Sequence, residues 1–320
     1  MRGSIPELAR WLESGAIALA AHVNPDCDTL GSAYAIGQAL AHLGARVALV
    51  SADEPPAMYD FMPFAGAFVR PDQLPFAPDK LLCVDCADLG RIGDVDGLLD
   101  GIRQVAVLDH HLTNECAAAP AVIDETATAT GVLALLLIDE LGAPLTPDMA
   151  ICLYAAIATD CGNFSFSNTT PEALIASARC LATGFDIADL TYRLFRARRP
   201  ARIRLLGAAL NGIEYRLGGR LALIRVTAQM SAAAGAGPED LDGIVNFGVD
   251  TEGVELSIVA EERQGFTRFS LRSKERINVA ALAAAFGGGG HERAAGCSIA
   301  LPFGDAIHAM LPAAEGALEE

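Results

Sequence analysis

Short apolar runs alternate with segments of helical spacing through the first half of the chain. Apolar runs that read as buried strands cover residues 16–23, 46–51, 80–85 and 104–108. Helical patterns cover residues 4–13, where Ser4 and Glu7 suggest a capping box, and residues 31–43. Two more helices are expected to begin at Thr146-Pro147 and Thr170-Pro171. This alternation is typical of βαβ units and predicts a parallel sheet covered by helices.

The second half predicts a smaller α/β domain. Strand-like segments cover residues 220–227, 254–261 and 266–272, and a helix is expected over 278–286. Residues 190–210 have helical spacing, are interrupted by Pro200 and carry six arginines, which form either a solvated helix face or a surface that steers nucleic acid. We therefore expect an α/β protein with a first domain at 1–186, a helical linker at 187–210 and a second domain at 211–320.

Composition and charge limit the kinds of ligand that we expect this chain to bind. The chain has 320 residues, 52% of them apolar, which suffices for about two domains. The apolar runs are too short to span a membrane, and no secretory signal is recognised, so we expect a cytoplasmic protein with free thiols. Residues 1–185 carry 8 Lys and Arg against 23 Asp and Glu, which accounts for most of the net charge of −17. An acidic first half argues against binding of long duplex DNA and favours metal ions or short anionic ligands.

Acidic and histidine residues follow the ends of several predicted elements. They are His22, Asp26, Asp28, Asp85, Asp109, His110, His111 and Asp160. The carboxyl ends of parallel strands form one rim, so these side chains can converge there. Carboxylates and imidazoles suit Mn²⁺ or Mg²⁺ more than structural zinc, and the four carboxylates of Asp26, Asp28, Asp85 and Asp160 need two divalent ions to balance their charge. The pattern predicts a two-ion centre that hydrolyses a phosphoester.

Four consecutive glycines, residues 287–290, follow the helix expected at 278–286 and precede His291. Glycine permits left-handed backbone and exposes N–H groups, which is how a chain builds an anion-binding nest. The alternative is a helix stop followed by a flexible loop, for which one glycine would do. We interpret the segment as a phosphate-binding loop.

These motifs resemble those of the DHH phosphoesterases. The resemblance rests on His22-x-Asn24-Pro25-Asp26-x-Asp28-x-x-Gly31-Ser32, Val84-Asp85, Asp109-His110-His111 and Thr159-Asp160-x-Gly162-Asn163-Phe164. Ser270-Leu271-Arg272-Ser273 and residues 287–296 look like the DHHA1 domain that follows the DHH domain in that family. The motifs stand in the right order over nearly the whole chain, and its length is similar to that of the bacterial oligoribonuclease and pAp-phosphatase subfamily.

The resemblance implies a role for each site residue. His22, Asp26 and Asp85 would hold one ion, and Asp28, Asp85, His110 and Asp160 the other, with Asp85 bridging. His111 would contact the scissile phosphate, and Asp109 would orient a neighbouring histidine. The substrate-binding residues would be Arg272, Ser273, Gly288, Gly289, Gly290 and His291, acting across an interdomain cleft. The implied cofactors are two divalent cations, Mn²⁺ before Mg²⁺ or Co²⁺.

The implied activity is hydrolysis of short single-stranded oligonucleotides (nanoRNA) to mononucleotides and of 3′-phosphoadenosine 5′-phosphate (pAp) to AMP. No membrane partner is expected, and a homodimer is left open. Alternative substrates are cyclic or linear signalling dinucleotides. A catalytically silent nucleotide-binding regulator is the alternative of another class, and inorganic pyrophosphatase ranks lowest.

Other residues near the motifs have two interpretations each. Cys27 stands where the family usually has glycine, and Cys86 and Cys161 also adjoin proposed ligands. These thiols are either small core side chains or oxidation-sensitive groups. Phe164 and Phe166 are expected on an extended segment, either packed in the core or stacked on a base.

Overall fold

The structure is a computed structural model of the whole chain, and it describes residues 2–93, 101–111, 114, 118–274 and 276–319. The chain divides into two compact units, Met1–Ala197 and Arg198–Glu320. The division falls inside the segment 187–210 that was expected to link two domains. Within the described residues, no helix is long and apolar enough to cross a membrane.

The first unit is built on a six-stranded parallel sheet. Its strands are β1 (Ala16–Ala20), β2 (Arg46–Val50), β3 (Phe68–Val69), β4 (Lys80–Val84), β5 (Gln104–Asp109) and β6 (Ala121–Ile123). They lie in the order β3-β2-β1-β4-β5-β6, and every pair is parallel. The order reverses between β1 and β4. In open α/β sheets a ligand crevice forms at the carboxyl ends of the strands on either side of such a reversal.

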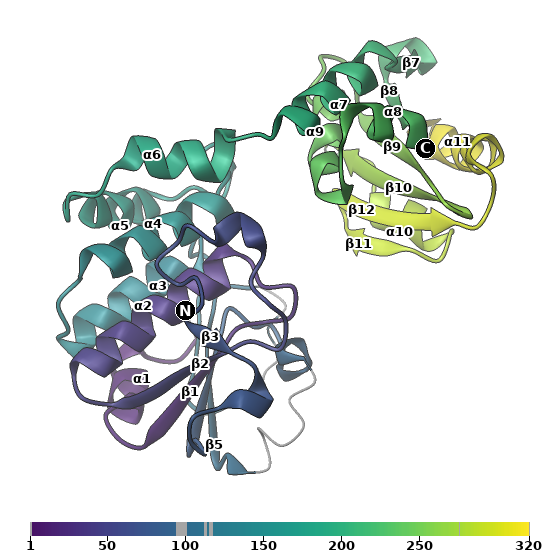
Figure 1. Cartoon of the computed structure of the whole chain (residues 1–320). Helices are drawn as coiled ribbons and strands as arrows, with labels where there is room; N and C mark the ends of the chain where they lie inside the picture. The colour runs from purple at the N-terminus through teal and green to yellow at the C-terminus, as the bar shows by residue number, and fades with distance from the viewer. Residues whose placement is uncertain (1, 94–100, 112–113, 115–117, 275, 320) are drawn as a thin grey trace. The chain divides into compact units, whose positions relative to one another are not determined.

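Helices cover the sheet of the first unit (Figure 1). They are α1 (Ile5–Leu12), α2 (Cys27–His42), α3 (Thr130–Leu141), α4 (Pro147–Asp160), α5 (Pro171–Leu181) and α6 (Ile187–Thr191). Helix α2 is almost wholly buried and packs against α3 and α4. Gly31 makes this packing close, because a Cβ there would lie 2.6 Å from the carbonyl oxygen of Cys152 on α4. The main core lies between these helices and the sheet.

The second unit has a mixed six-stranded sheet. Its strands are β7 (Glu214–Arg216), β8 (Leu221–Val226), β9 (Leu256–Arg263), β10 (Phe266–Ser273), β11 (Gly289–His291) and β12 (Ala294–Ile299). They lie in the order β11-β12-β10-β9-β8-β7, with only β8 and β9 parallel among the described pairs. Helices α10 (Val279–Ala284) and α11 (Phe303–Glu319) pack on one face. Helices α7 (Pro200–Asn211), α8 (Ala228–Ala234) and α9 (Ile244–Val249) pack on the other. The predicted α/β class is confirmed for both units.

Several predicted boundaries were wrong. Helix α1 begins after Ser4, but the side chain of Ser4 makes no capping hydrogen bond, so the capping box is absent. Strand β1 ends at Ala20 rather than Val23. Helix α2 begins four residues before Gly31, because Oδ1 of Asp26 accepts hydrogen bonds from the backbone N–H of Asp28 (3.0 Å) and of Thr29 (3.2 Å).

Two more predictions differ from the structure: the extended segment that contains Phe164 and Phe166, and the loop at the glycines 287–290. Residues 163–166 are not extended: Asn163 and Phe164 have φ of 54° and 64° and lie in the turns after α4. Phe164 packs edge-to-face against Tyr154, with ring centroids 5.9 Å apart. The glycine segment is not wholly a loop, since Gly289–His291 form β11 against β12.

The arginines around residue 200 are largely engaged by the protein itself. Arg193 pairs with Asp189 at 2.9 Å, and Arg199 contacts Glu239. The guanidinium of Arg204 donates to the carbonyl of Ala234 at 3.4 Å. The structure therefore favours a solvated, internally paired cluster over a nucleic-acid surface.

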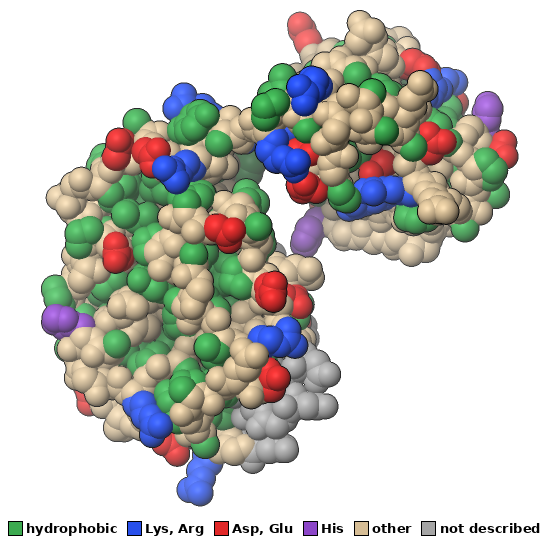
Figure 2. All heavy atoms as spheres, viewed as in Figure 1, with side chains coloured by type: hydrophobic (Ala, Val, Ile, Leu, Met, Phe, Trp, Pro, Cys, Tyr) green, Lys and Arg blue, Asp and Glu red, His purple; other side chains and the backbone are tan. Residues whose placement is uncertain are grey.

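Asp and Glu side chains are scattered over the face of the first unit that Figure 2 shows, in keeping with its acidic composition.

Candidate metal centre

His22 and Asp85 follow the two strands at which the sheet order reverses. The Nδ1 atom of His22 lies 2.8 Å from the carbonyl oxygen of Val23, which assigns the ring proton to Nδ1. Its Nε2 then faces two carboxylates, 3.7 Å from Oδ1 of Asp26 and 3.6 Å from Oδ2 of Asp85. His22, Asp26 and Asp85 thus form one group whose ligand atoms converge.

Asp85 lies at the centre of the site. Its backbone N–H continues the pairing of β4 with β5 by donating to Leu108 O at 2.9 Å, and its φ of 61° then turns the chain sharply. A positive φ is uncommon for a residue with a Cβ, and such strain is concentrated at functional sites. While Oδ2 faces His22, Oδ1 lies 3.6 Å from Nε2 of His110. One buried carboxylate therefore faces two groups of ligands.

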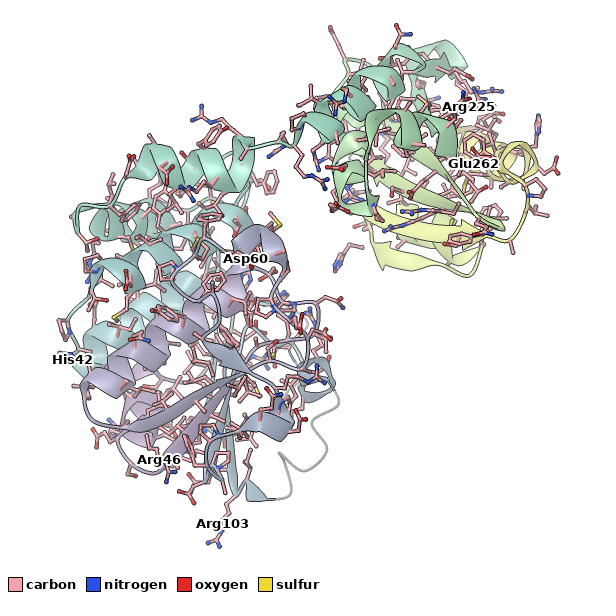
Figure 3. All side chains as sticks on the ribbon, viewed as in Figure 1. His42, Arg46, Asp60, Arg103, Arg225 and Glu262 are labelled. Atoms are coloured by element: carbon pink, nitrogen blue, oxygen red, sulfur yellow. The ribbon has the colours of Figure 1, made fainter. Side chains whose placement is uncertain are left out.

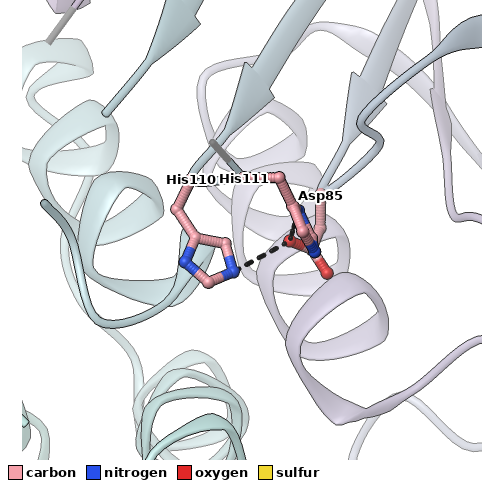
Figure 4. A group of neighbouring side chains, drawn as sticks. All are labelled: Asp85, His110 and His111. Atoms are coloured by element: carbon pink, nitrogen blue, oxygen red, sulfur yellow. Dashed lines mark ion pairs between the residues drawn. The ribbon is translucent and has the colours of Figure 1, made fainter. Parts of the chain in front are cut away.

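The second group combines Asp28, His110 and Asp160. The Nε2 atom of His110 lies 3.8 Å from Oδ2 of Asp28 and 3.7 Å from Oδ2 of Asp160. The other ring nitrogen, Nδ1, is 3.2 Å from the carbonyl oxygen of Ala127. Such a contact fixes the ring and leaves Nε2 free to bind a metal. Figure 4 shows His110 and His111 with Asp85; Nε2 of His110 and Nδ1 of His111 each lie 3.6 Å from Oδ1 of Asp85.

Asp28 is held by the amino terminus of α3. Its Oδ2 accepts from the N–H of Thr130 at 2.7 Å, and its Oδ1 accepts from the N–H of Gly131 at 2.8 Å. Ala129, which precedes α3, has no side-chain acceptor, so Asp28 satisfies donors that the helix leaves unpaired. The hydroxyl of Thr130 also donates to Oδ1 of Asp85 at 2.8 Å. Thr130 therefore connects two proposed ligands.

His111 belongs to a separate hydrogen-bonded chain. Its Nδ1 lies 2.8 Å from Oδ1 of Asp109, a carboxylate with no solvent exposure. The other oxygen of Asp109 accepts from Nδ2 of Asn114 at 2.6 Å. With both oxygens occupied, Asp109 is fixed, and it orients the ring of His111 while leaving Nε2 available. The histidine that Asp109 orients is thus His111.

The shifts in pKa show that the negative charges of these buried carboxylates repel one another. Burial raises the pKa of Asp28 well above its usual value, and the nearby charges of Asp85 and Asp160 raise it further. Burial also raises the pKa of Asp160, to about 6, against the opposing effect of His110. Burial disfavours the charged form of His22, but hydrogen bonds to Asp26 and Asp85 outweigh it and raise the pKa of His22 to about 10. Cations would relieve this repulsion, so the residues fit a metal site.

Three contributors to the site escaped sequence reasoning: Thr130, Asn114 and Arg91. Both Thr130 and Asn114 are buried and polar; Thr130 donates to the proposed ligand Asp85, and Asn114 donates to Asp109. Arg91 lies beside His22, with Nη2 3.5 Å from Nδ1. Asn114 stands shortly after the motif Asp109-His110-His111, and this position is a sequence signal for it. Thr130 and Arg91 stand apart from any recognised motif, so only the fold brings them to the site.

The three cysteines beside proposed ligands are inaccessible. Cys27, Cys86 and Cys161 have no solvent-exposed surface. Burial raises the pKa of all three thiols, and neighbouring carboxylates raise those of Cys27 and Cys86 further. A reactive thiol needs a lowered pKa and access to solvent. The structure therefore favours small core side chains over redox-sensitive groups.

The residues expected to bind substrate lie in the second unit and are only partly brought together. Arg272, Gly289, Gly290 and His291 line a cavity of about 380 Å³. Ser273 and Gly288 are not among its lining residues. The hydroxyl of Ser273 donates to Ile277 O at 2.5 Å, and a Cβ on Gly288 would meet the backbone of Gly296. Ser270, quoted above as part of the DHHA1-like segment, and Arg268, which stands outside every motif, line the cavity on the same strand as Arg272.

The fold and the acid-and-imidazole centre define a class of protein: an α/β protein with acidic and histidine groups that could hold metal ions. Comparison with known families agrees: residues 16–157 match the DHH family, N-terminal domain, and residues 224–320 match the DHHA1 domain. The bifunctional oligoribonuclease and PAP phosphatase NrnA of Thermus thermophilus is 34% identical over 311 residues, which cover 93% of this chain and 92% of that protein. The chain belongs to the DHH family, as its motifs predicted.

Solved structures share the fold. An exopolyphosphatase-related protein from Bacteroides fragilis is 24% identical and has a TM-score of 0.87, with 98% of this chain and 95% of that chain covered. The exonuclease RecJ bound to manganese is 17% identical and has a TM-score of 0.57, and the match covers 100% of this chain and 96% of that chain. These likenesses establish the architecture, which carries the acid-and-imidazole centre described above.

Proposed function

We propose that the chain hydrolyses phosphoester bonds in short single-stranded oligonucleotides and in pAp, with two divalent cations as cofactors. The observation that carries the proposal is Asp85, whose two oxygens face two separate groups of ligands. The similarity to a bifunctional oligoribonuclease and PAP phosphatase over nearly the full length of both chains supports the choice of substrates.

His22, Asp26 and Asp85 would hold one cation, and Asp28, Asp85, His110 and Asp160 the other. When bound, divalent ions act as Lewis acids on a phosphoryl group and activate water for attack. The donor set of oxygens and imidazole nitrogens suits Mn²⁺, our preferred ion, and also Mg²⁺ or Co²⁺.

His111 and Asp109 would act on the substrate rather than hold a cation. The hydrogen bond that His111 Nδ1–H donates to Asp109 raises the pKa of His111 despite the opposing effect of burial, and this favours a protonated ring. With Nδ1 held by Asp109, the proton on Nε2 is free to be donated to a phosphoryl oxygen. A fixed donor placed where negative charge develops stabilises the transition state.

The cavity of the second unit would hold the end of the substrate. Arg272 provides a guanidinium, and His291 provides an imidazole beside the glycines of β11. Both groups suit a terminal phosphate or a sugar hydroxyl. That this cavity and the metal centre act on one substrate molecule is part of the proposal, as are a cytoplasmic location and the option of a homodimer.

A panel of substrates tests the proposed function. Turnover of pAp, a five-nucleotide RNA and a cyclic dinucleotide would be measured with Mn²⁺, Mg²⁺ and Co²⁺. We expect hydrolysis of pAp and RNA, strongest with Mn²⁺, and its loss in His110→Ala. His42→Ala is the matched control, since His42 is exposed at the far end of α2 (Figure 3). Faster hydrolysis of the cyclic dinucleotide than of pAp and RNA would contradict the proposed substrates and favour signalling dinucleotides. Nucleotide binding without turnover would indicate a catalytically silent regulator.

A further inference from the structure

Arg91 is a basic residue placed beside the acidic centre. It lies in the short 3-10 helix η3 (Leu89–Ile92), which follows Asp85 in the chain. The carbonyl oxygen of Arg91 accepts a hydrogen bond from the N–H of Val23 at 2.6 Å, which fastens η3 to the loop after β1. The guanidinium lies against His22, with Nη2 3.5 Å from Nδ1. Its position is thus tied to a proposed metal ligand.

The guanidinium has no anionic partner within the described part of the chain. Some other arginines of the first unit pair with carboxylates, such as Arg179 with Asp139 at 2.6 Å and Arg193 with Asp189 at 2.9 Å. No carboxylate of the described residues lies within 4.0 Å of the Arg91 guanidinium. The proton of His22 Nδ1 already points to Val23 O, so this ring edge offers the guanidinium no acceptor. A half-buried arginine in this position can still bind an anion.

We propose that Arg91 binds the phosphoryl group that is hydrolysed, as a catalytic residue additional to His111. The inference rests on the proposed function, because it needs a phosphate at the metal centre. The positive charge of Arg91 also acts on His111, where it opposes in small part the rise in pKa that Asp109 causes.

The chemistry of arginine suits this role. Its planar fork donates two parallel hydrogen bonds to two oxygens of one phosphate. In phosphoryl transfer, charge spreads over the non-bridging oxygens of the transition state, and a positioned arginine stabilises it. The carboxylates of the centre would be engaged by cations, which leaves the substrate as the anion available to Arg91.

The experiment compares Arg91→Met with Arg103→Met in the full chain loaded with Mn²⁺. Arg103 is an exposed arginine just before β5, at the opposite end of the strands from the metal centre, and it is labelled in Figure 3. We expect Arg91→Met to lower kcat/KM for pAp and RNA roughly 10²- to 10³-fold. Binding of inorganic phosphate to the Mn²⁺-loaded protein, measured by calorimetry, should weaken roughly ten-fold. Arg103→Met should change neither.

Mn²⁺ affinity separates a phosphate-binding role from a structural one. Removing a positive charge near the cations should leave Mn²⁺ affinity unchanged or increase it. Arg91→Lys, which keeps the charge but loses the fork, should give intermediate phosphate binding. Weaker Mn²⁺ binding or a lowered Tm in both variants would overturn the proposal in favour of a structural role.

The two proposals can fail separately. If the unaltered protein hydrolyses neither pAp nor RNA, the proposed function fails, while phosphate binding still tests Arg91. Phosphate binding that is equal in the unaltered protein and in Arg91→Met overturns the role of Arg91. Absence of phosphate binding in both also overturns it.

Discussion

Without metal, Asp160→Asn should have a higher free energy of unfolding than the unaltered protein. With metal bound, its free energy of unfolding should be the lower of the two. Asp160 lies at the carboxyl end of α4, and its side chain is 28% exposed and 3.7 Å from Nε2 of His110. Burial raises its pKa from 3.8 to about 6, and the charges of Asp85 and Asp26 contribute. The substitution removes a charge that the metal-free fold disfavours, while it also removes a proposed metal ligand.

The magnitude follows from proton linkage. A carboxyl with a raised pKa binds more protons in the folded than in the unfolded chain, so stability falls as pH rises through about 4 to 6. A shift of about two pKa units corresponds to about 3 kcal/mol, and partial exposure of Asp160 reduces this to about 1–3 kcal/mol. Above pH 6 with chelator present, Asp160→Asn should therefore be more stable by that amount. Below pH 4 the two proteins should be equal.

Thermal and urea unfolding provide the assay, each performed in EDTA and in excess Mn²⁺. The unaltered protein should gain about 2.7 kcal/mol at a Mn²⁺ concentration 100 times its Kd, and Asp160→Asn should gain much less. The sign of the difference between the two proteins should thus reverse when metal is added. Asp60→Asn is the control, since Asp60 is exposed on the same unit (Figure 3). A destabilised Asp160→Asn in EDTA at pH 8, or an equal gain with Mn²⁺, would refute the reasoning.

Further predictions concern individual groups. Mn²⁺ binding should release protons near pH 7, because His22 has its pKa raised to about 10 and must be neutral to bind metal; calorimetry in buffers of different ionisation enthalpy should show release that declines towards pH 10. Thr130→Val should weaken Mn²⁺ binding roughly 10- to 100-fold in a metal titration, since it removes the hydrogen bond to Asp85, while Thr130→Ser should retain it. Arg272→Ala should raise KM for pAp more than it lowers kcat in steady-state kinetics, because Arg272 would bind a part of the substrate that does not react.

The convergence of the proposed ligands could be predicted because several of them follow strand ends. His22 and Asp85 follow neighbouring parallel strands, so the period of the apolar residues alone places them at one edge. Asp160 required more, since it comes from the end of a helix rather than of a strand. The DHH motif and the order of the other motifs supplied that information.

Contacts made through tertiary packing could not be predicted. Thr130 reaches Asp28 and Asp85 only because α3 begins opposite α2, at a distance in the chain of about a hundred residues from Asp28. The prediction of an extended segment at Phe164 was wrong for a similar reason, since its aromatic ring packs against Tyr154. Gly162 and Asn163 favour a turn, but nothing in the local sequence indicates left-handed backbone at Phe164 itself. In the second unit, the glycines pair as β11 because β12 lies beside them.

Anomalous diffraction from crystals grown with Mn²⁺ would test the two-ion centre most directly. We predict two manganese peaks in the first unit, one among His22, Asp26 and Asp85, and the other among Asp28, Asp85, His110 and Asp160. Asp85 should contact both ions through different oxygens. A single peak, peaks at other residues, or no peak at saturating Mn²⁺ would contradict the account.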